Sequence, residues 1–171
     1  MSYLTRLFRK RPDPREQVEA LWAALIAEAR RPVWYAERGV ADTVAGRFDM
    51  VTAVLALAML RMEREPELAV LTGPLTELFV EDMDGQLRQT GVGDLMVGKQ
   101  IGKLMSTLGG RTGAMRKALA QEGDAALADA ARRNITLADE SRVGALAEGL
   151  RALSARFDAT GAAGFVRGAI S

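Results

Sequence analysis

The chain has 171 residues, of which 49% are hydrophobic and 26% are charged, and its formal net charge is +1. This length and balance predict one soluble domain with a real core, and a charge so close to neutral does not indicate a nucleic-acid partner. The chain contains no cysteine and no histidine. Their absence excludes disulfides, thiolate nucleophiles, Ser-His-Asp triads and metal sites built on histidine or thiolate. The composition therefore favours a binding protein over an enzyme and predicts no cofactor and no metal.

Hydrophobic residues recur with a helical period along most of the chain, and strand alternation is almost absent, so we expect an all-α fold. Asp13 and Pro14 predict the start of the first helix, and Pro32 and Gly39 predict a break after it. Gly109-Gly110 predicts a second break, inside the later part of the chain. The expected helices cover about 14–29, 43–65, 74–90, 94–108, 112–121, 124–134 and 143–157.

The expected helices form a single compact multi-helix domain over residues 13–160, between a basic leader (1–12) and a flexible C-terminal tail (161–171). The most apolar stretch, residues 50–60, is shorter than the roughly 20 residues that cross a bilayer, so it predicts a buried core helix. Charged residues begin at Arg6 and leave no room for the hydrophobic part of a signal peptide.

The leader combines apolar and basic side chains, namely Leu4, Arg6, Leu7, Phe8, Arg9, Lys10 and Arg11. Two interpretations remain open for it. The segment is either a solvated, disordered leader, or it makes transient contact with an anionic membrane surface. In the second case each basic residue near the surface contributes about 1 kcal/mol.

The stretch "GVGDLMVGKQ" (91–100) has the G-x-x-x-x-G-K spacing of a phosphate-binding loop. The segment before it is a predicted helix rather than a strand, and Gln100 stands where a Ser or Thr would hold magnesium. A structural corner explains more residues: Gly91 adopts a positive φ after one helix, Gly93 lets the chain turn, and Asp94 caps the next helix. An NTPase is therefore nearly excluded.

Three acidic residues are not obviously directed to solvent: Asp49, Asp82 and Asp94. In one interpretation, Asp49 and Asp82 form partly buried ion pairs with basic residues, and Asp94 is only a helix cap; the candidate partners are Arg47, Arg88, Lys99 and Lys103. In the other, these residues form a polar recognition patch around the corner. A calcium loop beginning at Asp82 is rejected, because its sixth and twelfth positions hold Leu87 and Gly93 instead of glycine and glutamate.

Three blocks in the middle of the chain resemble the ubiquinol–cytochrome c chaperone family. They are "RPVWYAERGVADTVAGRFDMVTAVLALAMLRM" (31–62), "FVEDMDGQLRQTGVGDLMVGKQIGKL" (79–104) and "GRTGAMRKAL" (110–119). The resemblance covers roughly residues 30–120 and implies an assembly factor for the cytochrome bc1 complex, with cytochrome b or a bc1 assembly intermediate as its partner. Because the chain has no obvious transit peptide, we expect a bacterial-type member that acts in the cytoplasm, peripheral to the inner membrane, and we expect it to be a monomer.

The family motifs and the unusual charges together give the predicted partner-binding residues: Arg47, Asp49, Asp82, Asp84, Arg88, Gly91, Gly93, Asp94 and Lys99. An alternative function is a peripheral membrane protein that binds lipid or quinone through its N-terminus and a cleft between helices. A flat surface joining residues 42–50 with 82–99 favours the chaperone, and a pocket deep enough for a quinone tail favours the alternative.

Overall fold

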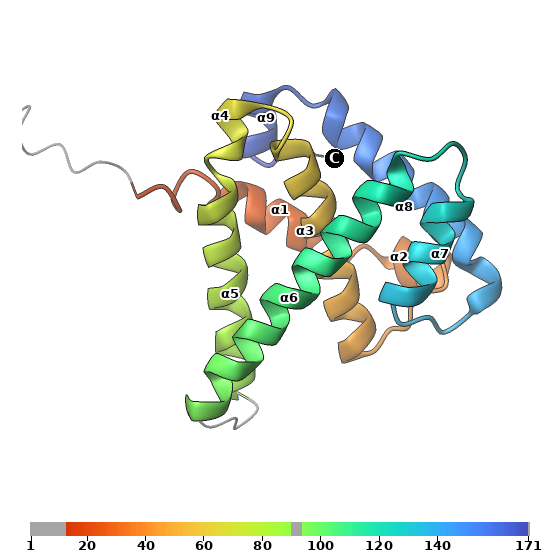
Figure 1. Ribbon diagram of the computed structural model, residues 1–171, viewed down its shortest axis with the longest axis horizontal. Coiled ribbons are helices and arrows are strands. Elements are labelled where there is room, and N and C mark those ends of the chain that lie inside the picture. Colours follow the sequence, from red (N-terminus) through yellow and green to blue (C-terminus); the bar gives the residue numbers. More distant parts are fainter. Residues whose placement is uncertain (1–12, 90–93, 171) are drawn as a thin grey trace, which may run out of the picture.

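Helices follow one another along the chain in the computed structural model (Figure 1), which confirms the predicted all-α class. The structure describes the backbone of residues 13–89 and 94–170, and the side chains of these ranges outside residues 87–97. Within this part of the chain, β pairing is limited to one isolated bridge between Val40 and Leu137. The α-helices are α1 (Glu19–Ala29), α2 (Pro32–Ala36), α3 (Val44–Met62), α4 (Pro66–Ala69), α5 (Thr72–Gln89), α6 (Asp94–Leu119), α7 (Ala125–Asn134), α8 (Val143–Ala159) and α9 (Ala162–Val166), with a 3-10 turn, η2 (Glu140–Arg142), before α8.

The central helix is α3, and it packs against α1, α6 and α8. The sequence offers Asp42 or Thr43 as the cap of this helix, and the structure shows Thr43, whose side chain accepts a hydrogen bond from the backbone N–H of Gly46. The apolar run that follows is buried almost without interruption from Thr52 to Ala58. A helix covered on several sides needs apolar residues all round, which is what this sequence supplies.

Two long helices, α5 and α6, lie beside each other as a hairpin whose far end stands out from the other helices (Figure 1). Leu75, Phe79 and Met83 form the buried stripe of α5 at the expected spacing. The corner between the helices, residues 90–93, lies outside the described residues, and so does the predicted positive φ of Gly91.

The predicted break at Gly109-Gly110 is wrong, because α6 continues through it to Leu119. Leu108 on one side of the glycine pair and Met115 on the other are both only 2% exposed. Two helical glycines cost about 1 kcal/mol each relative to alanine, less than the burial of two such side chains contributes. Tertiary packing therefore overrides the local signal, and no separate helix covers 112–121.

The first helix begins later than predicted, and the first break contains a short helix. Asp13 does accept a hydrogen bond from the N–H of Arg15, at 2.9 Å, but the chain then runs through turns, and α1 begins at Glu19. Pro32 opens α2 instead of only interrupting the chain. Gly39 makes the expected turn with a φ of 80°.

The predicted flexible C-terminal tail is wrong for residues 161–170, which pack on the rest of the domain. This segment forms α9, and both Phe165 and Ile170 are buried, with exposed fractions of 0% and 3%. The ring of Phe165 meets that of Phe157 edge-on at a centroid distance of 5.4 Å. The predicted leader (1–12) and its membrane-contact residues lie outside the described part of the chain. Within the described part, no helix is both long enough and apolar enough to cross a membrane.

Candidate functional site

Asp49 joins three segments of the fold from a buried position on α3, where it is 7% exposed. Its Oδ1 lies 2.5 Å from Nη2 of Arg111 on α6. Its Oδ2 accepts hydrogen bonds from the backbone N–H and the hydroxyl of Thr136, at 2.9 and 2.6 Å. Arg111 also donates to the hydroxyl of Thr52 on α3.

The expected burial of Asp49 is therefore confirmed, but its cation is Arg111. The predicted partners were Arg47, Arg88, Lys99 and Lys103. Both oxygens of the Asp49 carboxylate are engaged inside the protein. Asp49 fixes α6 and the segment after α7 against α3, and so it positions the surface around it.

Arg47 lies on the exposed side of the same helix. Its Nε is 2.6 Å from Oδ1 of Asp42, and its guanidinium lies 5.9 Å from the ring centre of Tyr35. The hydrogen bond from Arg47 lowers the pKa of Asp42, while desolvation raises the pKa of Tyr35. Gly46 lies between Asp42 and Arg47 in the chain. Packing requires a glycine there, because a Cβ would collide with the carbonyl oxygen of Ala41.

An apolar groove lies between α1, α3, α5 and α6, with a volume of about 630 Å³. Its lining includes Ile26, Val44, Phe48, Val51, Met83 and Leu104. Val44, the first residue of α3, is 89% exposed and so leaves its apolar side chain open to solvent at the edge of the groove. The groove joins the start of α3 with α5 and α6, so it lies between the two regions that carry the motifs.

Two arginines, Arg30 and Arg47, line this groove and also a smaller adjoining hollow of about 350 Å³, which contains Tyr35 and Asp42. Arg47 is neutralised by Asp42. Within the described side chains, no carboxylate pairs with Arg30, because Glu28 is engaged by Arg31 and Arg156. Among the described side chains, the shared edge of the two hollows therefore has an excess of one positive charge.

A family model described as "Ubiquinol-cytochrome C chaperone" matches residues 36–171. The chain belongs to this family. The crystal structure of the Cbp3 homolog from Brucella abortus is similar to it, with a TM-score of 0.83 and 31% sequence identity over 98% of this chain and 95% of that chain. No curated protein matches the chain. The family match extends to the C-terminus and so includes α7, α8 and α9, which lie beyond the blocks that carried the resemblance.

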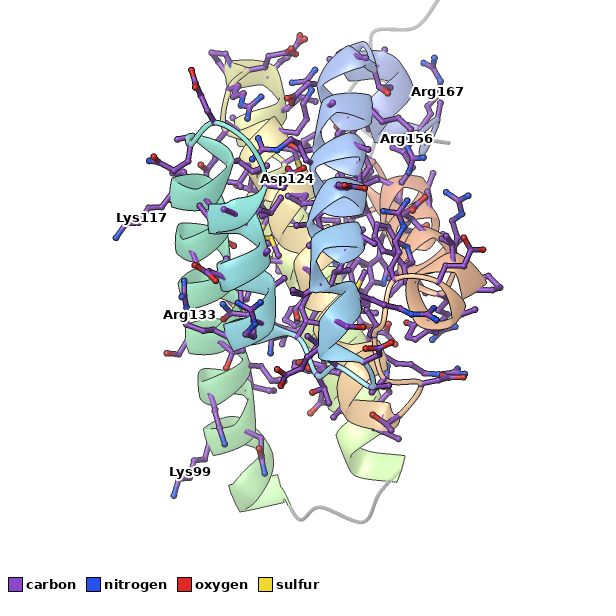
Figure 2. The ribbon with its side chains drawn as sticks, turned by 90° about the vertical axis from the view of Figure 1, so that its right-hand side faces the viewer. Lys99, Lys117, Asp124, Arg133, Arg156 and Arg167 are labelled. Carbon is purple, nitrogen blue, oxygen red and sulfur yellow. The ribbon has the colours of Figure 1, made fainter. Side chains whose placement is uncertain are left out.

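The ubiquinol–cytochrome c chaperone motifs bring only some of the predicted partner-binding residues to the groove. Arg47 lines it, Asp49 is buried on α3 outside the lining, and Asp82 and Asp84 are half-buried on α5. The exposed side chain of Lys99 points away from the body of the molecule (Figure 2). Gly91, Gly93 and the side chains of Arg88 and Asp94 lie outside the described residues. Arg30 and Leu104 were not predicted as site residues, because nothing in their local sequence indicates that both line the same groove.

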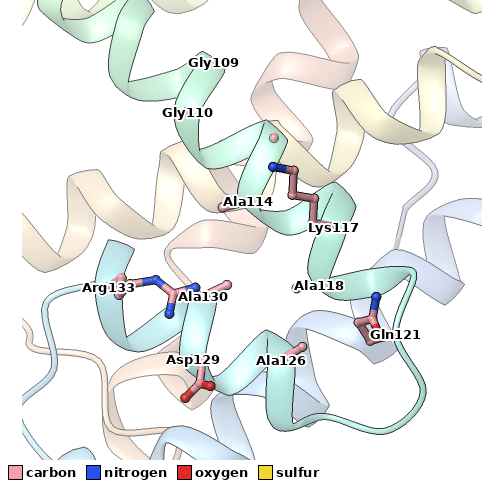
Figure 3. A pocket seen from close by; sticks show the side chains of 11 residues that line it. Gly109, Gly110, Ala114, Lys117, Ala118, Gln121, Ala126, Asp129, Ala130 and Arg133 are labelled. Atoms are coloured by element: carbon pink, nitrogen blue, oxygen red, sulfur yellow. The ribbon is translucent and has the colours of Figure 1, made fainter.

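A second hollow of about 610 Å³ lies between α6 and α7, where Gly109, Gly110 and Ala114 face Ala126 and Ala130 (Figure 3). No described atom lies within 4 Å of a Cβ built at either glycine. The same is true of Gly98 and Gly102 in the earlier part of α6. Within the described residues there is also no cluster of three or more side chains able to hold a metal.

Proposed function

We propose that this chain is an assembly chaperone of the ubiquinol–cytochrome c reductase (bc1) complex and binds newly made cytochrome b or an early intermediate. The observation that carries the proposal is the apolar groove between α3 and the α5–α6 hairpin, in a chain of the ubiquinol–cytochrome c chaperone family. A membrane protein that has not yet assembled exposes apolar surface, and a groove lined by apolar side chains removes such surface from water.

The chaperone acts by binding, without catalysis or a cofactor. We place it as a monomer in the cytoplasm, peripheral to the inner membrane, where its basic leader adds a weak contact with anionic lipid. Of the predicted partner-binding residues, Arg47 has the position to touch the client directly. Asp49 acts indirectly, through the orientation of α6.

The groove volume also supports a second candidate function. A volume of about 630 Å³ lies within the range of roughly 300–1,000 Å³ that is typical of small-molecule sites. A peripheral membrane protein that binds lipid or quinone would use such a cleft, and the chaperone proposal must be tested against it.

Deletion of the gene tests the proposed function. We expect less assembled bc1 complex and less membrane cytochrome b, with unchanged transcription of the cytochrome b gene, because an unprotected client is lost after synthesis. Blue native gels, haem spectra and transcript levels measure the three quantities. Re-expression of the chain is the control. Normal bc1 levels in a deletion strain without a second copy of the family would contradict the proposal.

A further inference from the structure

The uncompensated arginine beside the groove specifies more about the client than apolar surface alone. We propose that the groove takes an apolar helix of the client that carries one carboxylate side chain, and that this carboxylate pairs with Arg30. The inference rests on the proposed function, because it assigns the groove to the client. It adds the conformation of the bound segment and the one charge by which the groove recognises it.

The helical conformation follows from the polar groups that the groove offers. Its walls are the helices α1, α3, α5 and α6. Apart from the N–H groups in the first turn of α3, the backbone groups of these walls are bonded within their own helices, and the polar side chains of the lining are Arg30, Arg47 and Gln86. Neither residue of the Val40–Leu137 bridge, to which β pairing among the described residues is limited, belongs to the groove lining. An extended segment would bury its N–H and C=O groups without partners, whereas a helix satisfies them internally.

The carboxylate follows from what happens to Arg30 when the groove is filled. In the free protein the guanidinium of Arg30 is solvated, and no described carboxylate pairs with it. A wholly apolar occupant would remove water from this charge and provide nothing in return, which is unfavourable. Arg47 does not need a partner from the client, because Asp42 already neutralises it. One Asp or Glu on the client helix would therefore neutralise the positive charge of Arg30.

Peptides test the inference on the full-length chain. Each probe is a fluorescein-labelled synthetic peptide that covers one membrane helix of the organism's cytochrome b, in detergent below its micelle concentration, and binding is measured by anisotropy. We expect tight binding only of a peptide with an acidic residue. Arg30→Glu should weaken that binding at least tenfold, while the matched exposed variant Arg167→Glu should change it less than twofold.

Charge exchange separates recognition from a general loss of structure. Replacing the acidic residue of the bound peptide by lysine should abolish binding to the wild-type chain and restore it to Arg30→Glu. Circular dichroism of all variants shows whether each remains folded. A photo-crosslinking amino acid at Val44 should give an adduct with cytochrome b in cells. The equally accessible control site Val70, which is 73% exposed outside the groove lining, should not.

The possible results distinguish this inference from the proposed function. If an apolar peptide binds equally well to wild type and Arg30→Glu, the carboxylate pairing is overturned and the chaperone proposal stands. If no cytochrome b peptide binds, but oleate or decylubiquinone does, the groove belongs to a lipid or quinone and the inference is overturned. If none of these probes binds, the groove is not the client site and the inference is again overturned, whatever the deletion strain shows.

Discussion

At the scale of single residues, the motif at residues 42–50 takes part in one buried and one exposed ion pair, and the two pairs contribute very differently to stability. The side chains of Asp49 and Arg111 are 10% and 11% exposed, whereas those of Asp42 and Arg47 are 57% and 59% exposed. Exposed pairs contribute about 0–1 kcal/mol, because water and salt screen them. Breaking a buried pair leaves a charge without a partner in a medium of low polarity.

We therefore predict that Asp49→Ala lowers the free energy of unfolding by about 3–5 kcal/mol, since it leaves Arg111 buried and uncompensated and removes both hydrogen bonds from Thr136. Urea denaturation followed by circular dichroism measures the change. The matched control is Asp42→Ala, which should cost at most about 1 kcal/mol. Equal effects of the two substitutions would show that the pair between α3 and α6 is not a main support of the fold.

At the scale of helices, the sequence predicted those elements whose local and tertiary signals agree. The long apolar helix α3 has a capping Thr43 and an unbroken buried run, so the sequence predicts the helix and its start, although α3 ends at Met62 and not at residue 65. Two features, the continuity of α6 and the helix α9, were not predicted because contacts distant in sequence decide them. The glycine pair in α6 is held helical by packing on both sides, and α9 forms because Phe165 finds a place beside Phe157 on α8.

The candidate site, like the helices, could be predicted only in part from the sequence. Its motif residues could be selected from the sequence, and the burial of Asp49 could be expected from its place at the start of the apolar run. Its partner Arg111 is 62 residues away in the chain, so only the crossing of α3 and α6 determines the pairing. Arg30 is at the end of α1 in an unremarkable run of arginines, and its role depends on the groove that four helices build.

The glycine pair of α6 gives a prediction at this scale. Gly109→Ala and Gly110→Ala should each raise the free energy of unfolding by about 1 kcal/mol, because alanine loses less conformational entropy in a helix and no described atom lies within 4 Å of the added Cβ. Thermal and urea denaturation measure this. In contrast, Gly46→Ala in α3 should destabilise the fold through its collision with the carbonyl oxygen of Ala41. Loss of stability at position 109 or 110 would mean that a close neighbour occupies that face.

At the scale of the whole molecule, the C-terminal segment packs against the first helix, α1. Gly168 has a φ of 79°, and a Cβ there would lie 2.7 Å from the carbonyl oxygen of Ala20 on α1. Arg61, only 5% exposed, donates hydrogen bonds to the carbonyl oxygens of Phe157 and Thr160, at 3.0 and 3.2 Å, and its guanidinium lies 5.8 Å from the ring centre of Phe165. The end of the chain is thus tied to α1, α3 and α8 together.

This packing predicts that the last residues are needed for stability although they are far from the groove. A chain ending at Thr160 loses the fully buried Phe165 and the buried Ile170, and removing a buried Phe side chain alone typically costs about 3–5 kcal/mol. Since a domain of ordinary stability has roughly 5–15 kcal/mol in total, we expect the truncated chain to be largely unfolded or strongly destabilised in urea denaturation. Phe165→Ala should produce a large part of the same loss, whereas Arg167→Ala, at an exposed position in the same segment, should not. In cells the truncated chain should support less bc1 assembly in proportion to its own reduced level, because the groove residues themselves are unchanged. A truncated chain as stable as the full one would show that the segment only rests on the surface.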